Sequence, residues 1–260
     1  LFAAFPNSQG SLGYATRLRI ELQPIAPRVA LRNVRFHDLD ELVLAIDAVI
    51  ATGDWDGQRV DAMDAVMFDP TESYLVLATF TDETGRTSDY TGSAIYYRSL
   101  RERPTDMLTA NDYLWRWDTD WFWCSKPFGV QNPVLRRLWP ARYRRSDVYH
   151  RIYMLEQRYG VVARLDRWRG RPAAERVVQD VELPARNTAE FLRWFAAHVP
   201  MSPVWLCPLR PRDRVWPLYP LKPGENYVNA GFWGAVPIRP GDADGATNRA
   251  IEAMVTDLDG

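Results

Sequence analysis

The sequence of 260 residues predicts an α+β fold, in which an antiparallel sheet carries helices on one face. Residues 29–81 show a strand-like run, a helical pattern and two further strand-like runs, and residues 176–233 repeat this order. Both helical patterns place apolar residues on one side, so each helix has a single face to bury. A composition of 47% hydrophobic and 25% charged residues is that of a globular chain and excludes a disordered one.

The first 27 residues predict the end of a separate domain. Leu18, Ile20 and Leu22 alternate with charged residues across 14–23, the pattern of a half-buried strand. Pro24 and Pro27 would end that strand, so we place one domain over 1–27 and a second over 28–260. Because the chain lacks an initiator Met and stops directly after a helical pattern, we expect a fragment of a longer protein.

The two repeated units supply the predicted sheet and helices. Their strand-like runs are 29–36, 60–68, 73–81, 176–183, 203–209 and 226–233. The helices are predicted over 38–52 and 188–199, each opened by a capping box, at Asp38–Glu41 and at Asn187–Glu190. A last helical pattern carries Ile251, Val255 and Leu258. We therefore expect the helices over 38–52 and 188–199 to cover one face of the sheet.

An insertion at about 90–172 separates the two units, and neither of its halves shows a regular strand pattern. The first half carries five large rings, Trp115, Trp117, Trp121, Phe122 and Trp123. These rings could be core, which is the usual role of such clusters, or they could line a flat apolar pocket. The second half carries Arg136, Arg137, Arg142, Arg144, Arg145 and Arg151. These arginines form either a solvated helical face or a surface for a membrane or partner, with Trp139, Tyr143 and Tyr149 as anchors.

Several functional classes are excluded by composition and motif. A net charge of −1 argues against a nucleic-acid binder, and no apolar run is long enough to span a bilayer. The three histidines lack metal-ligand spacing, so we expect no metal site. Two cysteines are too few for a disulfide framework and favour a cytoplasmic protein, with association at a membrane surface as an open alternative.

Two short motifs are candidates for chemistry. Gly10 and Gly13 lie directly before the predicted strand, where they permit a tight turn that a ligand can approach closely, although a plain turn explains them equally well. Gln179 and Asp180 form a polar pair inside an apolar strand, on opposite faces of it. A polar pair in a buried strand costs free energy unless it is satisfied, so it is either hydrogen-bonded structure or part of a site.

Several segments together resemble one flavoprotein superfamily. The stretch Phe5-Pro6-Asn7-Ser8-Gln9-Gly10-Ser11-Leu12-Gly13-Tyr14 resembles the closing segment of the FAD-binding domain in the vanillyl-alcohol-oxidase and p-cresol-methylhydroxylase flavoproteins. Asp120-Trp121-Phe122-Trp123, Val177-Val178-Gln179-Asp180 and Trp205-Leu206-Cys207-Pro208 resemble the narrower Δ24-sterol reductase-like branch. The order and rough spacing of these segments agree over about 230 residues. The glycine turn is shared widely, whereas the last two motifs are much more specific.

The resemblance implies a substrate-side cap domain and an FAD-dependent oxidoreductase, with NADPH as a candidate electron donor. On this basis residues 1–27 are the last strand segment of an FAD-binding domain, and the fragment alone is expected to be inactive. The FAD-contacting residues would be Ser8, Gly10, Ser11, Leu12, Gly13 and Tyr14. The substrate, apolar and sterol-like, would meet Trp121, Trp123, Arg210 and Asn229, with Asp180 and Gln179 as catalytic candidates.

Two alternatives remain open at this stage. Within the same superfamily, an oxidase of a sugar, an alditol or a hydroxy acid needs several polar groups to bind hydroxyls. A non-catalytic binding module fits the lack of nucleophile and metal motifs.

Overall fold

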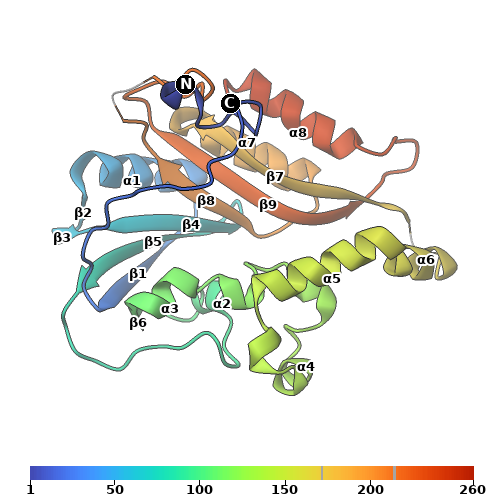
Figure 1. The fold of residues 1–260 in the computed structure, drawn as a ribbon, viewed down its shortest axis with the longest axis horizontal. Coiled ribbons are helices and arrows are strands. Elements are labelled where there is room, and N and C mark those ends of the chain that lie inside the picture. Colours follow the sequence, from blue (N-terminus) through green and yellow to red (C-terminus); the bar gives the residue numbers. More distant parts are fainter. Residues whose placement is uncertain (171, 213–214) are drawn as a thin grey trace.

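The computed structural model describes residues 1–170, 172–212 and 215–260. They contain a seven-stranded sheet in the order β6-β1-β5-β4-β8-β9-β7, in which every pair of neighbours is antiparallel (Figure 1). The strands of this sheet are β1 (Arg28–Phe36), β4 (Ala62–Asp69), β5 (Glu72–Thr81), β6 (Thr105–Thr109), β7 (Ala174–Pro184), β8 (Val204–Leu209) and β9 (Tyr227–Pro237). A short hairpin, β2 (Asp54–Trp55) with β3 (Gln58–Arg59), lies apart from it.

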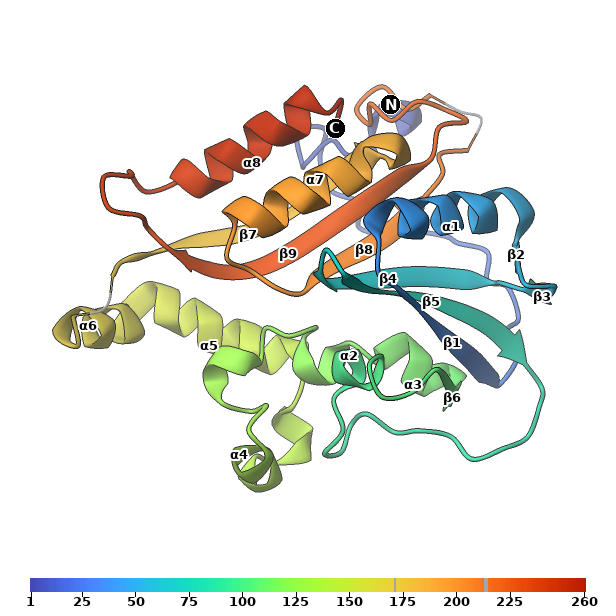
Figure 2. The same cartoon turned by 180° about the vertical axis from the view of Figure 1, so that it is seen from behind.

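Helices lie on both sides of this sheet. The helices are α1 (Leu39–Thr52), α2 (Tyr96–Ser99), α3 (Ala110–Trp115), α4 (Pro133–Leu138), α5 (Ser146–Tyr159), α6 (Val161–Trp168), α7 (Ala185–His198) and α8 (Ala246–Asp257). Helices α1, α7 and α8 cover one side, which we call the helix face (Figures 1 and 2). Helices α2 to α6 belong to the insertion and lie on the other side, which we call the insertion face.

The predicted repetition is present in the topology. Strand β1, helix α1 and strands β4 and β5 form one unit, and β7, α7, β8 and β9 form the other. In both units the first strand pairs with the third, which pairs with the second. The units meet where β4 pairs with β8, with Ala65 opposite Leu206. The predicted antiparallel sheet with helices 38–52 and 188–199 on one face is thereby confirmed.

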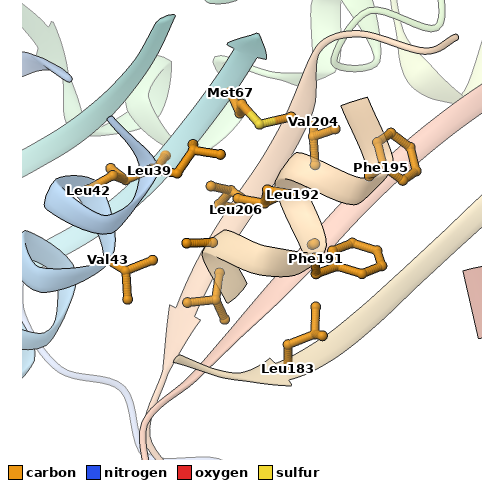
Figure 3. Close-up of a cluster of buried hydrophobic side chains, with 14 of the residues drawn as sticks. Leu39, Leu42, Val43, Met67, Leu183, Phe191, Leu192, Phe195, Val204 and Leu206 are labelled. Atoms are coloured by element: carbon orange, nitrogen blue, oxygen red, sulfur yellow. The ribbon is translucent and has the colours of Figure 1, made fainter. Parts of the chain in front are cut away.

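The main core fills the space between the sheet and the helix face. Phe191, Leu192 and Phe195 of α7 are fully buried there against Leu183 and Leu206 (Figure 3). Their spacing places all three on the inward side of a helix, and burying a ring or a branched side chain of this kind stabilises the fold by about 1.5–3 kcal/mol each. Repeated apolar spacing in the sequence is therefore what fixes α1 and α7 to the sheet.

The two predicted helix caps have different outcomes. Asp38 caps α1 as expected, since its carboxylate accepts hydrogen bonds from the backbone N–H groups of Asp40 and Glu41. The cap predicted at residues 187–190 is wrong, because α7 already begins at Ala185, directly after β7. Asn187 instead donates its side-chain amide to the backbone carbonyl of Leu258 and so ties α7 to the end of α8.

The insertion covers one half of the opposite face. Val29, Val76 and Leu108 form a second buried core there with Tyr96 of α2 and Trp123. No regular strand pattern is visible in the sequence of the insertion, yet β6 extends the sheet by pairing with β1. Because β6 has only five residues and follows an irregular loop, period-two alternation is too short to detect in it.

The strand predicted over 14–23 is absent, since these residues are extended coil with exposed side chains. A strand is stable only when its backbone hydrogen bonds are paired, and no strand in the described part of the chain pairs with this segment. The domain boundary at residue 27 stays a prediction. No helix among the described residues has the length and apolar character needed to cross a membrane.

Candidate functional site

Four aromatic side chains gather on the insertion face where β8 and β9 leave the covered half of the sheet. We call Phe122, Trp123, Trp205 and Trp233 the aromatic cluster. The Trp233 ring lies 4.6 Å from the Phe122 ring, 5.4 Å from that of Trp123 and 6.1 Å from that of Trp205, between centroids. These distances are within the range of favourable aromatic packing. Trp123 is buried in the second core, whereas Phe122, Trp205 and Trp233 are half-buried and form the exposed edge of that core.

A strained turn delivers two of these rings to the cluster. Trp121 and Phe122 both have left-handed backbone conformations, with φ values of 45° and 60°. Bulky residues rarely adopt such values, and the cost is met only where the surroundings hold the chain in place. The turn sends Phe122 and Trp123 to the sheet, whereas Trp121 packs on His150 and Tyr153 of α5. The structure therefore separates Trp121 from the aromatic cluster.

Asp180 lies at the edge of the aromatic cluster, on the exposed part of β7. Its carboxylate accepts a hydrogen bond from the indole N–H of Trp233, at 3.2 Å. Surrounding protein raises the pKa of Asp180 above its usual value by disfavouring the charged form, and the Trp233 hydrogen bond opposes this rise. An exposed carboxyl group with a raised pKa beside an apolar surface is suited to proton transfer.

Gly231 makes this pairing of Asp180 and Trp233 sterically feasible. It lies opposite Asp180 in the β7–β9 pairing and opposite Trp205 in the β8–β9 pairing. A Cβ atom at this position would come within 2.5 Å of the Trp233 ring and 2.7 Å of the Asp180 carboxylate. The absence of a side chain on Gly231 thus leaves the space in which the indole reaches across to β7.

The other predicted catalytic and substrate residues are spread over the sheet. Gln179 lies on the helix face, where it donates to the side chain of Asn248 in α8, so it cannot touch the same molecule as Asp180. Asn229 lies on the insertion face between Glu182 and Cys207, and its side-chain oxygen is buried with no hydrogen-bond partner. Arg210 is exposed and follows β8, five residues beyond Trp205, or roughly 16 Å along an extended chain.

Two buried ion pairs nearby escaped the sequence analysis. Asp64 of β4 accepts hydrogen bonds from Arg116 at 2.9 Å and from the indoles of Trp117 and Trp205 at 3.2 Å. Arg136, predicted to lie on a basic surface, is instead buried and chelates the Asp120 carboxylate at 2.7 and 3.0 Å. A buried guanidinium needs an acidic partner of this kind. The sequence of a basic stretch does not show which of its arginines has such a partner.

The predicted flavin-contacting segment forms a turn, as its two glycines indicated. Gly10 and Gly13 have φ values of 82° and 110°, and the Ser11 backbone N–H donates to the Ser8 carbonyl at 2.9 Å. Ser8 is buried, whereas Ser11, Leu12, Gly13 and Tyr14 are exposed. This exposed backbone can contact one edge of a planar ligand, and the assignment of that ligand as FAD stays a prediction.

The thiols near the site are poor nucleophiles. Burial raises the pKa of Cys124 to about 12 and also raises the pKa of Cys207, so both remain protonated at neutral pH. Among the residues that the structure describes, no group of three or more histidine, cysteine or acidic side chains could hold a metal ion. The described residues thus offer a carboxyl group and an aromatic surface as their chemistry.

The fold and site define an α+β protein in which two strand-helix-strand-strand units present an aromatic, acid-bearing sheet face. Over its whole length the chain is 24% identical to a Delta(24)-sterol reductase homolog of Caenorhabditis elegans and 23% identical to the Delta(24)-sterol reductase of Homo sapiens. It is thus a distant relative of these reductases, which confirms the resemblance seen in its motifs.

The matches cover only part of the related proteins. The chain spans about half the length of the curated relatives it matches, at 50% of each. A solved structure of a berberine bridge enzyme variant aligns with 92% of this chain and 41% of its own, at 10% identity and a TM-score of 0.36. No family model matches the chain.

Proposed function

We propose that this chain is the substrate-side part of an FAD-dependent oxidoreductase that reduces a C=C bond in a large apolar, sterol-like substrate. The observation that carries the proposal is the placement of Asp180 against Trp233 at the edge of the aromatic cluster. Similarity to Delta(24)-sterol reductases along the whole chain supports the same conclusion. A sugar or hydroxy-acid oxidase would need several polar groups instead, and this surface offers mainly rings.

The aromatic cluster would bind the substrate and keep water from it. Flat ring faces of Phe122 and Trp233 match a rigid apolar skeleton, since burial of apolar area contributes about 25 cal/mol per Å². The carboxyl group of Asp180, at the edge of this apolar surface, would be the polar contact to the substrate. This division into a broad apolar surface and one or two polar contacts is usual for small-molecule sites.

The residues that would face FAD are those of the turn at 8–14. Its exposed backbone and positive-φ glycines fit contact with one edge of the flavin. When bound, FAD would supply the hydride for the double bond, with NADPH as the proposed source of electrons. An isolated alkene accepts hydride poorly, so a proton must reach its other carbon from a well-placed acid.

Asp180 is the proposed proton donor. Its raised pKa increases the fraction of the carboxyl that carries a proton, and the Trp233 indole fixes the orientation of the group. The indole N–H of Trp233 contacts the Asp180 carboxyl group and does not itself transfer a proton, so the role of Trp233 is to position the acid. Gln179 has no part in this step, since it lies on the other face of the sheet.

The proposal is tested by replacing Asp180→Asn in the full-length protein and measuring the two half-reactions of the flavin separately. Flavin reduction by NADPH should be unchanged, whereas reoxidation by an unsaturated sterol should slow by about 100-fold or more. Glu182→Gln is the matched control, because Glu182 lies on the same face of the same strand and bonds Tyr219. Equal reoxidation rates in wild type and Asp180→Asn would eliminate Asp180 as the acid.

A further inference from the structure

The outer end of the insertion carries several exposed apolar side chains. Helix α5 ends at Gly160 in a left-handed conformation, and α6 follows at once in a new direction. In both views α6 lies at the far end of the arm formed by α5, away from the centre of the sheet (Figures 1 and 2). We call residues 158–169 the tip. Single exposed apolar residues are ordinary, but a group of them on a projecting element indicates a binding surface.

The exposed apolar side chains of α6 share one side of the helix. Val161, Leu165 and Trp168 are 60%, 39% and 83% exposed. Positions i, i+4 and i+7 of an α-helix lie within about 60° of one another around its axis, so the three form a single stripe roughly 10 Å long. The end of α5 adds exposed Tyr159 immediately before the turn. A short helix whose apolar side is open to solvent gains little free energy by folding alone. We therefore expect the apolar side of α6 to bind a surface.

Arginines border this stripe on both sides. Arg164 lies about 60° from Val161 around the helix axis, and Arg169 lies about 80° from it in the opposite direction. Arg158 and Arg167 add two further exposed cations to the tip. Arginine side chains placed beside an apolar stripe can extend their guanidinium groups to lipid phosphates while the stripe enters the acyl boundary.

The basic stretch that the sequence offered for this role, residues 136–151, is unsuited to it. Arg136 is buried on Asp120, and Tyr149, offered as an interfacial anchor, is fully buried with its hydroxyl donating to the Thr119 carbonyl. Arg145 forms an ion pair with Asp147, which reduces the local positive charge. Leu138 and Tyr143 remain exposed in that stretch, whereas the tip joins exposed cations and aliphatic side chains to a tryptophan that is 83% exposed.

We propose that the tip docks on an anionic lipid surface, with Val161, Leu165 and Trp168 inserted at the boundary of the head groups and the acyl chains. Charge decides between lipid and a second copy of this chain. A two-fold contact between two tips would bring Arg164 and Arg167 of each copy against the same cations of the other, which is repulsive. Phosphatidylserine presents the opposite charge beside an apolar layer, and each arginine near such a surface adds about 1 kcal/mol of attraction.

The test measures co-sedimentation of the full-length protein with two kinds of vesicle at low salt, phosphatidylcholine alone and phosphatidylcholine with added phosphatidylserine. The wild type should bind the anionic vesicles and bind the neutral ones much more weakly. Replacing Arg158, Arg164 and Arg167 together by Gln should weaken anionic binding by roughly 100-fold. The control replaces Arg137, Arg142 and Arg151 by Gln, which removes the same charge from exposed positions outside the tip.

A second variant, Leu165→Ala with Trp168→Ala, keeps every charge and removes most of the stripe. It should also lose anionic binding, and both side chains are exposed, so unchanged thermal unfolding confirms that the fold is intact. Three outcomes overturn the proposal: no binding of the wild type to anionic vesicles, equal losses in the tip and control arginine variants, or full binding by the apolar variant. A drop in oligomer size for the apolar variant would instead identify a second copy as the occupant. None of these measurements depends on redox activity.

Discussion

The two repeated units have the same connectivity but differ on the insertion face, which is covered in the first unit and open in the second. In β4 and β5 successive residues are buried on both sides, because helices cover one face and the insertion covers the other. In β7 buried and exposed residues alternate, because only the helix face is covered. A strand buried on both faces is committed to stability, whereas a strand with one open face has side chains free to meet a ligand. The second unit is therefore where function is to be sought.

Two aspartates on the insertion face, one in each unit, differ in burial and in hydrogen-bond partners. Asp64 in the first unit is buried and held by Arg116 and two indoles. Asp180 in the second unit is exposed and has the indole of Trp233 as its partner. A buried carboxylate paired with a guanidinium serves the fold, whereas an exposed one with a single neutral donor can exchange a proton. Burial and the partner's charge, rather than residue type, separate the two roles.

The largest effect should come from breaking the ion pair of the covered unit. Arg116→Met leaves Asp64 buried without its cation, so the free energy of unfolding should fall by about 3–5 kcal/mol. Arg176→Met on the open unit is the control. Arg176 is exposed and contacts the Tyr153 hydroxyl at 3.3 Å, so its loss should change stability by no more than about 0.5 kcal/mol. Urea unfolding measures both, and similar losses would mean that the two units do not differ as described.

Much of the fold could be predicted from the sequence because its main elements carry strong local signals. The strand-like runs near 29–36 and 73–81 and the helical pattern over 38–52 each hold a clear periodicity, and periodicity follows burial on one or both faces. The strand over 14–23 failed for the complementary reason. Its alternation is real, but a strand also needs a neighbour, and pairing is a long-range property that alternation does not encode.

The candidate site was harder to predict because its members come from three distant parts of the chain. Asp180 and Trp123 were named from the sequence, but Trp233, which joins them, and Gly231, which makes room for it, gave no local signal. The resemblance offers Gln179 together with Asp180, but the two side chains lie on opposite faces of β7, so only Asp180 reaches the aromatic cluster. Contacts across strands depend on register, which a single sequence leaves undetermined.

A smaller effect is expected from filling the space beside Asp180. Gly231→Ala places a methyl group where the Trp233 ring and the Asp180 carboxylate now approach, so the indole must move. The overpacking should lower the free energy of unfolding by about 1–3 kcal/mol and break the hydrogen bond. Gly234→Ala is the control, since a Cβ there meets only the flexible end of Met201, at 3.2 Å. Equal stability of Gly231→Ala and wild type, measured by thermal unfolding, would show that Trp233 is free to shift.

The smallest effect concerns the proton of Asp180 itself. The surrounding protein already raises the pKa of Asp180 above the ordinary 3.8, and the Trp233 indole partly offsets the rise by stabilising the charged form. Trp233→Phe removes that donor, so the pKa of Asp180 should rise further. The folded protein then holds this proton more tightly than the unfolded chain, so ionisation of Asp180 costs stability once the pH has passed both pKa values, and the variant enlarges that cost. Carbon-13 NMR of the carboxyl group measures the titration directly. Trp205→Phe is the matched control, because its indole donates to Asp64 instead. An upward shift in both variants would assign the effect to loosened packing of the aromatic cluster, and no shift in Trp233→Phe would remove the indole from the control of this acid.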